Sequence, residues 1–313
     1  MLFEHLSKHY PGGRYQAIYE SGFSGFSTYY SLISYGISCV IAHAADVPTG
    51  QNESVMKTDA VDSEKLARVL RDKSLKHTVH VPERETLDHR GMMRFRKQLC
   101  LQLSGYKARV KHLLYNNGVS IPDCFANRGT HWSNCFMRWL QEDVRLLSPT
   151  RETLDLELEQ VVRLRADVLS VTRKIHLLSR TERYAERMQL LLSIPGIGQI
   201  TAMSILTEVE RVDRFHGQDS FAHYLGLVPT CHDSGDRQKR GEMTFRGNKH
   251  LRTLMVESSW VAIRQDRALA ASYGDYCRRM MPQEAIVRIA RKLSNRVFSV
   301  LKTGKKYEYD KCC

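Results

Sequence analysis

The stretch from residue 150 to residue 194 contains no proline and no glycine, the residues that most often end a helix. Charged side chains alternate there with leucine and valine at spacings of three and four, so that each kind gathers on one helix face. The same pattern starts near residue 84, and the segment 92–118 ends at Gly118, a residue suited to a helix C-cap. We therefore predict a long helical or coiled-coil middle region over 84–190, acting as a spacer or a dimerisation element.

Residues 1–83 have a pattern typical of α/β structure. Short apolar runs at 15–22 and 36–44 are suited to buried strands, and the aromatic segment between them is suited to a helix. Residues 77–83 resemble one further edge strand, which Pro82 would end. We expect an α/β domain over 1–83.

Residues 191–313 predict a mostly α-helical domain. A glycine-containing turn opens it, and two amphipathic helices are expected around 249–265 and 283–304. The polar tail, 305–313, is expected to be frayed.

The chain is strongly basic, with 47 Lys and Arg against 34 Asp and Glu and a net charge of +13 over 313 residues. Such an excess favours a polyanion partner, usually nucleic acid, with an affinity that falls steeply as salt rises. The eight cysteines are scattered without a CxxC pair, so we predict reduced thiols and no structural zinc. No segment predicts a signal peptide or a membrane span, and we expect a cytoplasmic protein.

Asp59 and Asp62 lie three residues apart where a helix is expected to begin. Taken alone they are best interpreted as a helix cap at Asp59 and an acid near the helix dipole at Asp62. Residues three apart also share a face, so both carboxylates can reach one cation. Glu20 ends a predicted strand, where active-site residues of α/β sheets gather, although alone it would be a surface residue at a turn. Three such carboxylates suit Mg²⁺, which can stabilise the oxygens of phosphoryl transfer.

The segment 193–202, SIPGIGQITA, places Pro195, Gly196 and Gly198 in a tight turn between two helices. This is a helix-hairpin-helix pattern, whose exposed amides at a helix N-terminus can hold a DNA phosphate. A glycine-rich turn that only joins two packed helices is an equally good interpretation.

Ser234 lies in a Ser-Gly turn and is followed by a run of cations. A serine among groups that neutralise phosphate is a candidate nucleophile, although a plain solvated loop is the simpler interpretation of these residues alone. The candidate phosphate contacts are Arg237, Lys239, Arg240, Arg246, Lys249 and Arg252.

Six stretches in one order resemble the IS110/IS1111-type transposases. They are YESGFSGF, KTDAVDSEKLARVL, SIPGIGQITA, YLGLVPTCHDSG, RGNKHLRTLMVESSW and AIVRIARKLSNRVFSVLKTG. The resemblance implies an RNase H/RuvC-like domain with a DEDD acid set at 1–83 and a C-terminal transposase domain with a helix-hairpin-helix at 191–313.

The family's properties imply a division of labour. Glu20, Asp59 and Asp62 would be three of four acids that bind Mg²⁺, and Ser234 would form a transient phosphoserine link to DNA. The partners implied are the element ends and target DNA, a structured guide RNA, and further copies of the chain in a dimer or tetramer.

The chain departs from the family pattern in places. The family's first Asp stands in a strand resembling Gly-Ile-Asp, but no Asp precedes Asp46 here, so we expect an incomplete, N-terminally truncated RuvC-like domain. Position 244 is Thr where the family often has Ser, which leaves Ser234 as the better nucleophile. The alternatives are a metal-dependent RuvC-like nuclease in which Ser234 is only a loop residue, and a catalytically inactive nucleic-acid-binding remnant.

Overall fold

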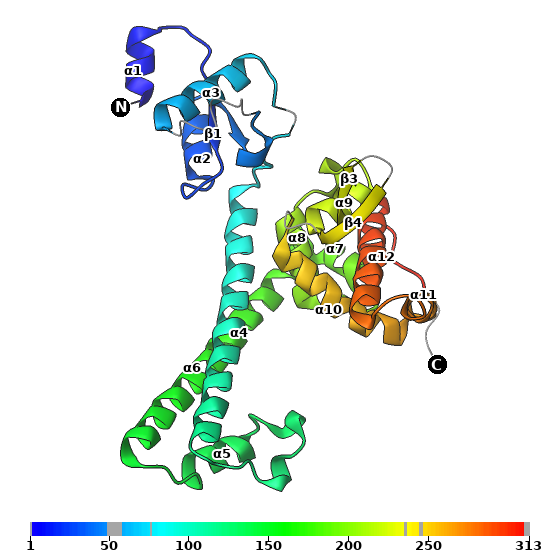
Figure 1. The fold of residues 1–313 in the computed structure, drawn as a ribbon. Coiled ribbons are helices and arrows are strands. Elements are labelled where there is room, and N and C mark those ends of the chain that lie inside the picture. Colours follow the sequence, from blue (N-terminus) through cyan, green and yellow to red (C-terminus); the bar gives the residue numbers. More distant parts are fainter. Residues whose placement is uncertain (1, 49–57, 76, 235–236, 244–246, 310–313) are drawn as a thin grey trace. The chain divides into compact units, whose positions relative to one another are not determined.

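The structure is a computed structural model that describes residues 2–48, 58–75, 77–234, 237–243 and 247–309 (Figure 1). The chain divides into two units, Met1–Glu83 and Arg84–Cys313. None of the helices it describes is long and apolar enough to cross a membrane.

The first unit is built on a two-stranded parallel sheet. Strands β1 and β2 pair from Gln16↔Ser38 to Glu20↔Ala42, with α2 as the crossover between them. Its elements are α1 (Leu2–His9), β1 (Gln16–Glu20), α2 (Ser27–Ser34), β2 (Ser38–Ala42), the 3₁₀ turn η1 (Ala44–Asp46) and α3 (Asp59–Arg71). The strands expected at 15–22 and 36–44 are thus confirmed, and the unit is α/β in character, but two described strands do not establish a RuvC-like sheet.

The edge strand predicted at 77–83 is wrong. That segment gives one main-chain hydrogen bond to the sheet, from Val79 N–H to the Ile41 carbonyl at 2.9 Å. Pro82 has no N–H to donate, and its carbonyl accepts from the Tyr30 hydroxyl at 2.5 Å instead of from a strand. The segment therefore contacts β2 without forming a strand of the sheet.

The second unit begins with a long helical hairpin, the arm, in which α4 and α6 pack side by side (Figure 1). Near its far end the two helices bury Val110, Leu114, Leu154 and Leu158 together with Phe136 of α5. The arm consists of α4 (Arg84–Asn116), the turns η3 (Asp123–Phe125) and η4 (Arg128–Thr130), α5 (Asn134–Glu142) and α6 (Ser148–Leu178).

The uninterrupted pattern over 150–194 does not form one helix. Helix α6 ends at Leu178, and α7 begins at Glu182 in a new direction. Between them the Ser179 hydroxyl donates to the His176 carbonyl and the Thr181 hydroxyl to the Leu178 carbonyl, both at 2.8 Å. These hydroxyls satisfy carbonyls of the last turn, so the helix can stop without proline or glycine.

The rest of the second unit, the C-terminal cluster, packs helices around α8. Every residue from 202 to 209 in α8 is buried, and α4, α7 and α10 pack against this helix. The cluster contains α7 (Glu182–Leu192), α8 (Gln199–Val209), η5 (Val212–Arg214), α9 (Gln218–Leu225), β3 (Pro229–Ser234), β4 (Arg237–Met243), α10 (Lys249–Gln265), α11 (Arg267–Cys277) and α12 (Pro282–Thr303). The expected helical character and the two predicted helices are confirmed.

The tail is held to the cluster as far as Tyr307, contrary to the expected fraying. The Tyr307 N–H donates to Ser193 Oγ at 2.8 Å, and its hydroxyl lies 3.1 Å from Asp266 Oδ2. The Arg296 guanidinium lies 4.7 Å from the centre of the Tyr307 ring and 2.6 Å from the same carboxylate. A buried acid, a cation and an aromatic ring thus anchor the described part of the tail.

Candidate functional site

Glu20, Asp59 and Asp62, the three acids predicted to bind metal, lie on β1 and α3 of the first unit. Glu20 is the last residue of β1 and is exposed, and α3, which carries Asp59 and Asp62, packs against β1. The cap predicted at Asp59 is wrong, because Thr58 is the N-cap and its Oγ1 accepts from the Val61 N–H at 3.4 Å. Asp59 is exposed in the first turn and Asp62 is half-buried, positions that the helix dipole favours for acids.

Their chemistry suits a hard cation, since carboxylate oxygens are the ligands that Mg²⁺ prefers. Over the ranges described, however, no group of three or more His, Cys, Asp or Glu side chains is close enough to hold a metal ion. Among the described residues the three acids therefore do not form an assembled centre, and their binding of Mg²⁺ stays a prediction.

The turn between α7 and α8 is shaped by close contact with α10. Gly196 has φ +82°, and a Cβ there would lie 2.2 Å from the Ser258 carbonyl oxygen and 3.0 Å from the Ala262 amide nitrogen. Pro195 is also buried, whereas Gly198 is exposed as the N-cap of α8. Packing against α10 thus explains why residue 196 is glycine. DNA contact at this turn stays a prediction, and the exposed Gly198 is the residue best placed to make it.

Ser234 is the last residue of β3, at the turn end of an antiparallel hairpin. Its backbone pairs with Arg237, the first residue of β4, and the hairpin continues to Pro229↔Met243. The expected loop is therefore a pair of strands, with a shift of register between Pro229 and Cys231 that is typical of a β-bulge. Arg237, Lys239 and Arg240 lie in β4, Lys249 and Arg252 lie in α10, and Arg246 lies outside the described residues.

The base of this hairpin is a contact between two backbones. A Cβ on Gly247, which has φ +120°, would lie 2.7 Å from both Cα and N of Gly226. A Cβ on Gly226, at φ +69°, would in turn lie 2.0 Å from an Arg252 guanidinium nitrogen. Asn248 adds a main-chain hydrogen bond from its N–H to the Tyr224 carbonyl at 2.8 Å. The chain entering the hairpin and the chain leaving it are thus fixed together.

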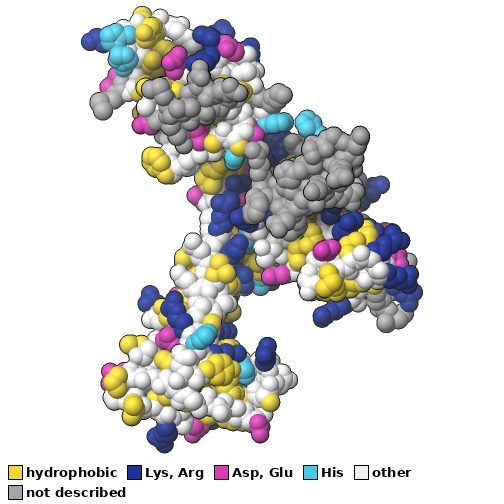
Figure 2. Space-filling model, viewed as in Figure 1, with side chains coloured by type: hydrophobic (Ala, Val, Ile, Leu, Met, Phe, Trp, Pro, Cys, Tyr) yellow, Lys and Arg dark blue, Asp and Glu magenta, His cyan; other side chains and the backbone are white. Residues whose placement is uncertain are grey.

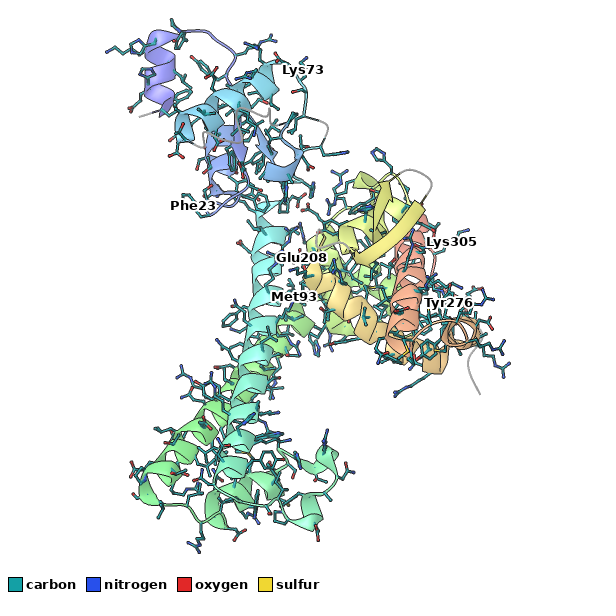
Figure 3. The ribbon with its side chains drawn as sticks, viewed as in Figure 1. Phe23, Lys73, Met93, Glu208, Tyr276 and Lys305 are labelled. Carbon is teal, nitrogen blue, oxygen red and sulfur yellow. The ribbon has the colours of Figure 1, made fainter. Side chains whose placement is uncertain are left out.

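Near the base of the hairpin, Glu208 of α8, which is labelled in Figure 3, lies at the centre of a buried polar network. Its side chain is 1% exposed and accepts two hydrogen bonds from Arg94, at 2.7 and 2.9 Å, and one from Asn248 Nδ2 at 2.9 Å. The Arg90 guanidinium lies 3.6 Å from the same carboxylate and donates to the Thr207 carbonyl at 3.0 Å. The hydrogen bonds to Glu208 raise the pKa of Arg94, so the guanidinium stays charged.

The network reaches the hairpin through Asn248 and Tyr224. Asn248 Oδ1 accepts from the Leu251 N–H at 3.1 Å and so caps α10, while its Nδ2 binds Glu208. The Tyr224 hydroxyl donates to the Glu208 carbonyl at 2.9 Å. Tyr224 and Asn248, which flank the hairpin, therefore both bind Glu208, and these contacts fix where the hairpin starts and ends.

Cations and the imidazole of His250 lie around this network. Burial is the main cause that lowers the pKa of His250, and the charge of Lys97 adds to it. Arg94 is more than half exposed, and Lys249 is exposed at the start of α10. The described surface beside the hairpin base is thus positive, although its central acid is neutralised.

This network was not predicted from the sequence. The available signal was Glu208 itself, a single acid at the end of the apolar run that forms α8. Such a residue is almost never buried unless it is paired. Its partners could not be found from sequence, because Arg90 and Arg94 lie more than 110 residues earlier in the chain.

Residues 188–274 match the family model described as the transposase IS116/IS110/IS902 family. The chain is 28% identical over 242 residues to y4qE of Sinorhizobium fredii, a match that covers 77% of this chain and 57% of that protein. It is 26% identical over 191 residues to the transposase for insertion sequence element IS1533 of Leptospira borgpetersenii, covering 61% and 54%. It is 35% identical over 79 residues to the transposase for element IS1111A of Coxiella burnetii, covering 25% and 22%.

The helical cluster, its basic hairpin and these matches define a relative of the insertion-sequence transposases. Over residues 188–274 the chain resembles the IS116/IS110/IS902 transposases, and the predicted resemblance is confirmed. The matched region includes the α7–α8 turn, Glu208, the Ser234 hairpin and α10. The chain spans just over half the length of the first two relatives named.

Proposed function

We propose that this protein acts as the transposase of an insertion sequence, cutting and rejoining DNA with Ser234 as the nucleophile. The observation that carries the proposal is the position of Ser234 at the turn end of a hairpin whose base is fixed by Gly226, Gly247 and the Glu208 network. A nucleophile for phosphoryl transfer needs such a defined position. The match to the transposase family covers the hairpin, Gly226, Gly247, Glu208 and Asn248.

The proposed reaction conserves phosphoester bonds. The Ser234 hydroxyl oxygen attacks a backbone phosphorus, a P–O bond to serine forms, and the P–O bond to the leaving strand breaks. The serine proton passes to the leaving oxygen. Attack by the hydroxyl of another strand end then reverses these changes, which joins DNA and restores the serine. Arg237, Lys239 and Arg240 follow Ser234 closely in the sequence and are proposed to neutralise the phosphate.

Glu20, Asp59 and Asp62 are proposed to hold Mg²⁺, which would supply charge stabilisation at the reacting phosphate. Their oxygen donors and their places at a strand end and a helix start support this assignment. Because they do not form an assembled centre among the described residues, no individual step is assigned to the ion.

The partners are proposed from charge and family. A net charge of +13 suits DNA and a structured guide RNA. Figure 2 shows Lys and Arg side chains gathered over α11 and α12, where Arg278, Arg279 and Arg288 are exposed. A dimer or tetramer is proposed from the family resemblance alone.

Strand cleavage and joining on DNA that carries the element ends tests the nucleophile. We expect Ser234→Ala to abolish both reactions, and Thr244→Ala, the control at the position where the family often has Ser, to keep them. Cutting by Ser234→Ala with Mg²⁺ would overturn the serine mechanism and favour a metal-dependent RuvC-like nuclease. Nucleic-acid binding without any cutting by the unmodified chain would favour an inactive binding remnant.

The acids are tested separately in an excision assay. Asp59→Ala and Asp62→Ala are expected to abolish excision while salt-sensitive DNA and RNA binding stays largely intact. Asp72→Ala, at the other end of α3, is the matched control and should excise normally. Excision at the unmodified rate by the Asp59 and Asp62 variants would remove the metal assignment.

A further inference from the structure

Trp132 occupies an unusual backbone conformation near the far end of the arm. Its φ is +70°, in the left-handed region that bulky residues rarely adopt, and it lies between η4 and α5. Its ring packs edge-on against Phe136, with centroids 5.6 Å apart. Strain of this kind persists only where the surroundings fix the residue, and it is concentrated at functional sites.

Two cations from the two arm helices fix Trp132. Lys107 Nζ of α4 lies 5.4 Å from the centre of the indole ring. Arg165 of α6 donates from Nη1 to the Trp132 carbonyl at 2.9 Å. Lys111 lies one helical turn beyond Lys107, on the same face of α4. We call Lys107, Lys111, Arg165 and Trp132 the Trp132 cluster.

The positive charge of this cluster is not neutralised by the protein. Throughout the described parts of the chain, Lys107, Lys111 and Arg165 form no ion pair with an acid. Burial lowers the pKa of Lys107, and the charges of Arg165 and then Lys111 lower it further. Arg165 and Lys111 are therefore close enough to Lys107 to repel its charge, and Lys107 is also partly desolvated.

An anion would relieve this repulsion, and a phosphate is the anion that suits the geometry. Arg165 uses one nitrogen on the Trp132 carbonyl, which orients its guanidinium and leaves the other donors of its fork available. Lysine ammonium groups add point charges from the opposite helix. A chain with a net charge of +13 already favours a polyanion that presents many phosphates.

We propose that the Trp132 cluster binds a phosphodiester of a nucleic-acid backbone, so that the arm holds nucleic acid. The proposal deepens the proposed function, since it rests on a nucleic-acid partner, but it does not depend on Ser234 chemistry. RNA and DNA share the phosphodiester, and the experiment distinguishes them.

The test measures binding alone, with the full chain carrying Ser234→Ala in the presence of EDTA. Fluorescence anisotropy follows a labelled hairpin RNA and a labelled DNA duplex of equal length over a range of salt. The double variant Lys107→Gln/Lys111→Gln is compared with Arg173→Gln/Lys174→Gln, which removes two exposed cations from α6 of the same arm. We expect the first to lower affinity about tenfold and to reduce the salt slope by about one to two, and the second to change neither.

The identity of the nucleic acid follows from which probe loses affinity. A loss confined to the hairpin RNA assigns the phosphodiester to RNA, and a loss confined to the duplex assigns it to DNA. Equal affinity and equal salt slope in both double variants would overturn the proposal, provided that thermal melting shows both to be folded. Failure of Ser234 to react with DNA would overturn the proposed function and leave this result unchanged.

Discussion

The C-terminal cluster and the first unit differ most in how many apolar side chains each buries. The cluster packs a large apolar core around α8 and closes it with the charged network of Glu208. Among its described residues the first unit buries Ala42, Val47 and Val69 as one small cluster, with Ile37, Cys39 and Ile41 also buried in or next to β2 of its two-stranded sheet. Sheets of two strands are marginally stable without further packing. The hairpin of Ser234 is thus held by a rigid support, whereas the three acids lie on the part of the molecule least able to fix their positions.

The largest effect is expected from removing Glu208. Glu208→Ala leaves Arg90 buried and unpaired, and this should lower the free energy of unfolding of the second unit by about 3–5 kcal/mol. Asp213→Ala is the control, because its ion pair with Lys302 is exposed and should cost less than about 1 kcal/mol. Equal denaturant midpoints for the two variants would contradict the supporting role of the network.

The next effect concerns the α7–α8 turn. Gly196→Ala forces a Cβ against the α10 backbone in the left-handed region, which should cost about 1–3 kcal/mol. Gly198→Ala is matched, since a Cβ there meets nothing within 4 Å, and should change stability by about 0.5 kcal/mol or less. Chemical denaturation measures both, and a Gly196 variant as stable as the Gly198 variant would show that the turn is not set by docking.

A change in the smaller core should act locally. Val69→Ala, at 6% exposure, is expected to cost about 1–2 kcal/mol and to open β1 and β2 without opening α8. Hydrogen exchange should show faster exchange at the Ile18 and Val40 amides and unchanged exchange in α8. Val61→Ala, half-exposed in the same helix, is the control. Loss of protection in α8 would mean that the two units unfold together.

The smallest effect is on pH dependence. Burial lowers the pKa of His89 and of His250 in the folded protein. At pH values below the ordinary histidine pKa of about 6.5, the unfolded chain therefore binds more protons than the folded protein. Stability should therefore be full above that pH and fall, by about 1 kcal/mol or less, as the pH drops towards 5.5. Replacing His89 and His250 by Gln should make the melting temperature depend less on pH, whereas replacing the exposed His216 by Gln should not. A curve equally steep in all variants would assign the dependence to other groups.

Sequence patterns predicted the elements whose signals are local. Apolar runs located β1 and β2, and the glycines located the α7–α8 turn. The break at Ser179 was missed because hydroxyls, rather than proline or glycine, end α6. Thr58 was missed as the cap because Asp59 beside it is an equally good cap former.

The parts of the site that escaped prediction depend on long-range contacts. Glu208 meets arginines from α4, and Gly247 meets Gly226, pairings that only the packed helices bring together. The held tail has the same cause, since Tyr307 binds Ser193 and Asp266 from distant helices. Local periodicity carries no information on such pairs.

The most direct test of the account is to map the link between protein and DNA. The full chain is incubated with DNA that carries the element ends, the reaction is trapped, and the protein is digested and examined by mass spectrometry. We expect a nucleotide phosphate on the peptide that contains Ser234, retained in Thr244→Ala and lost in Ser234→Ala. A link at any other residue, or strand cutting that leaves no link while Ser234→Ala cuts equally well, would contradict the account.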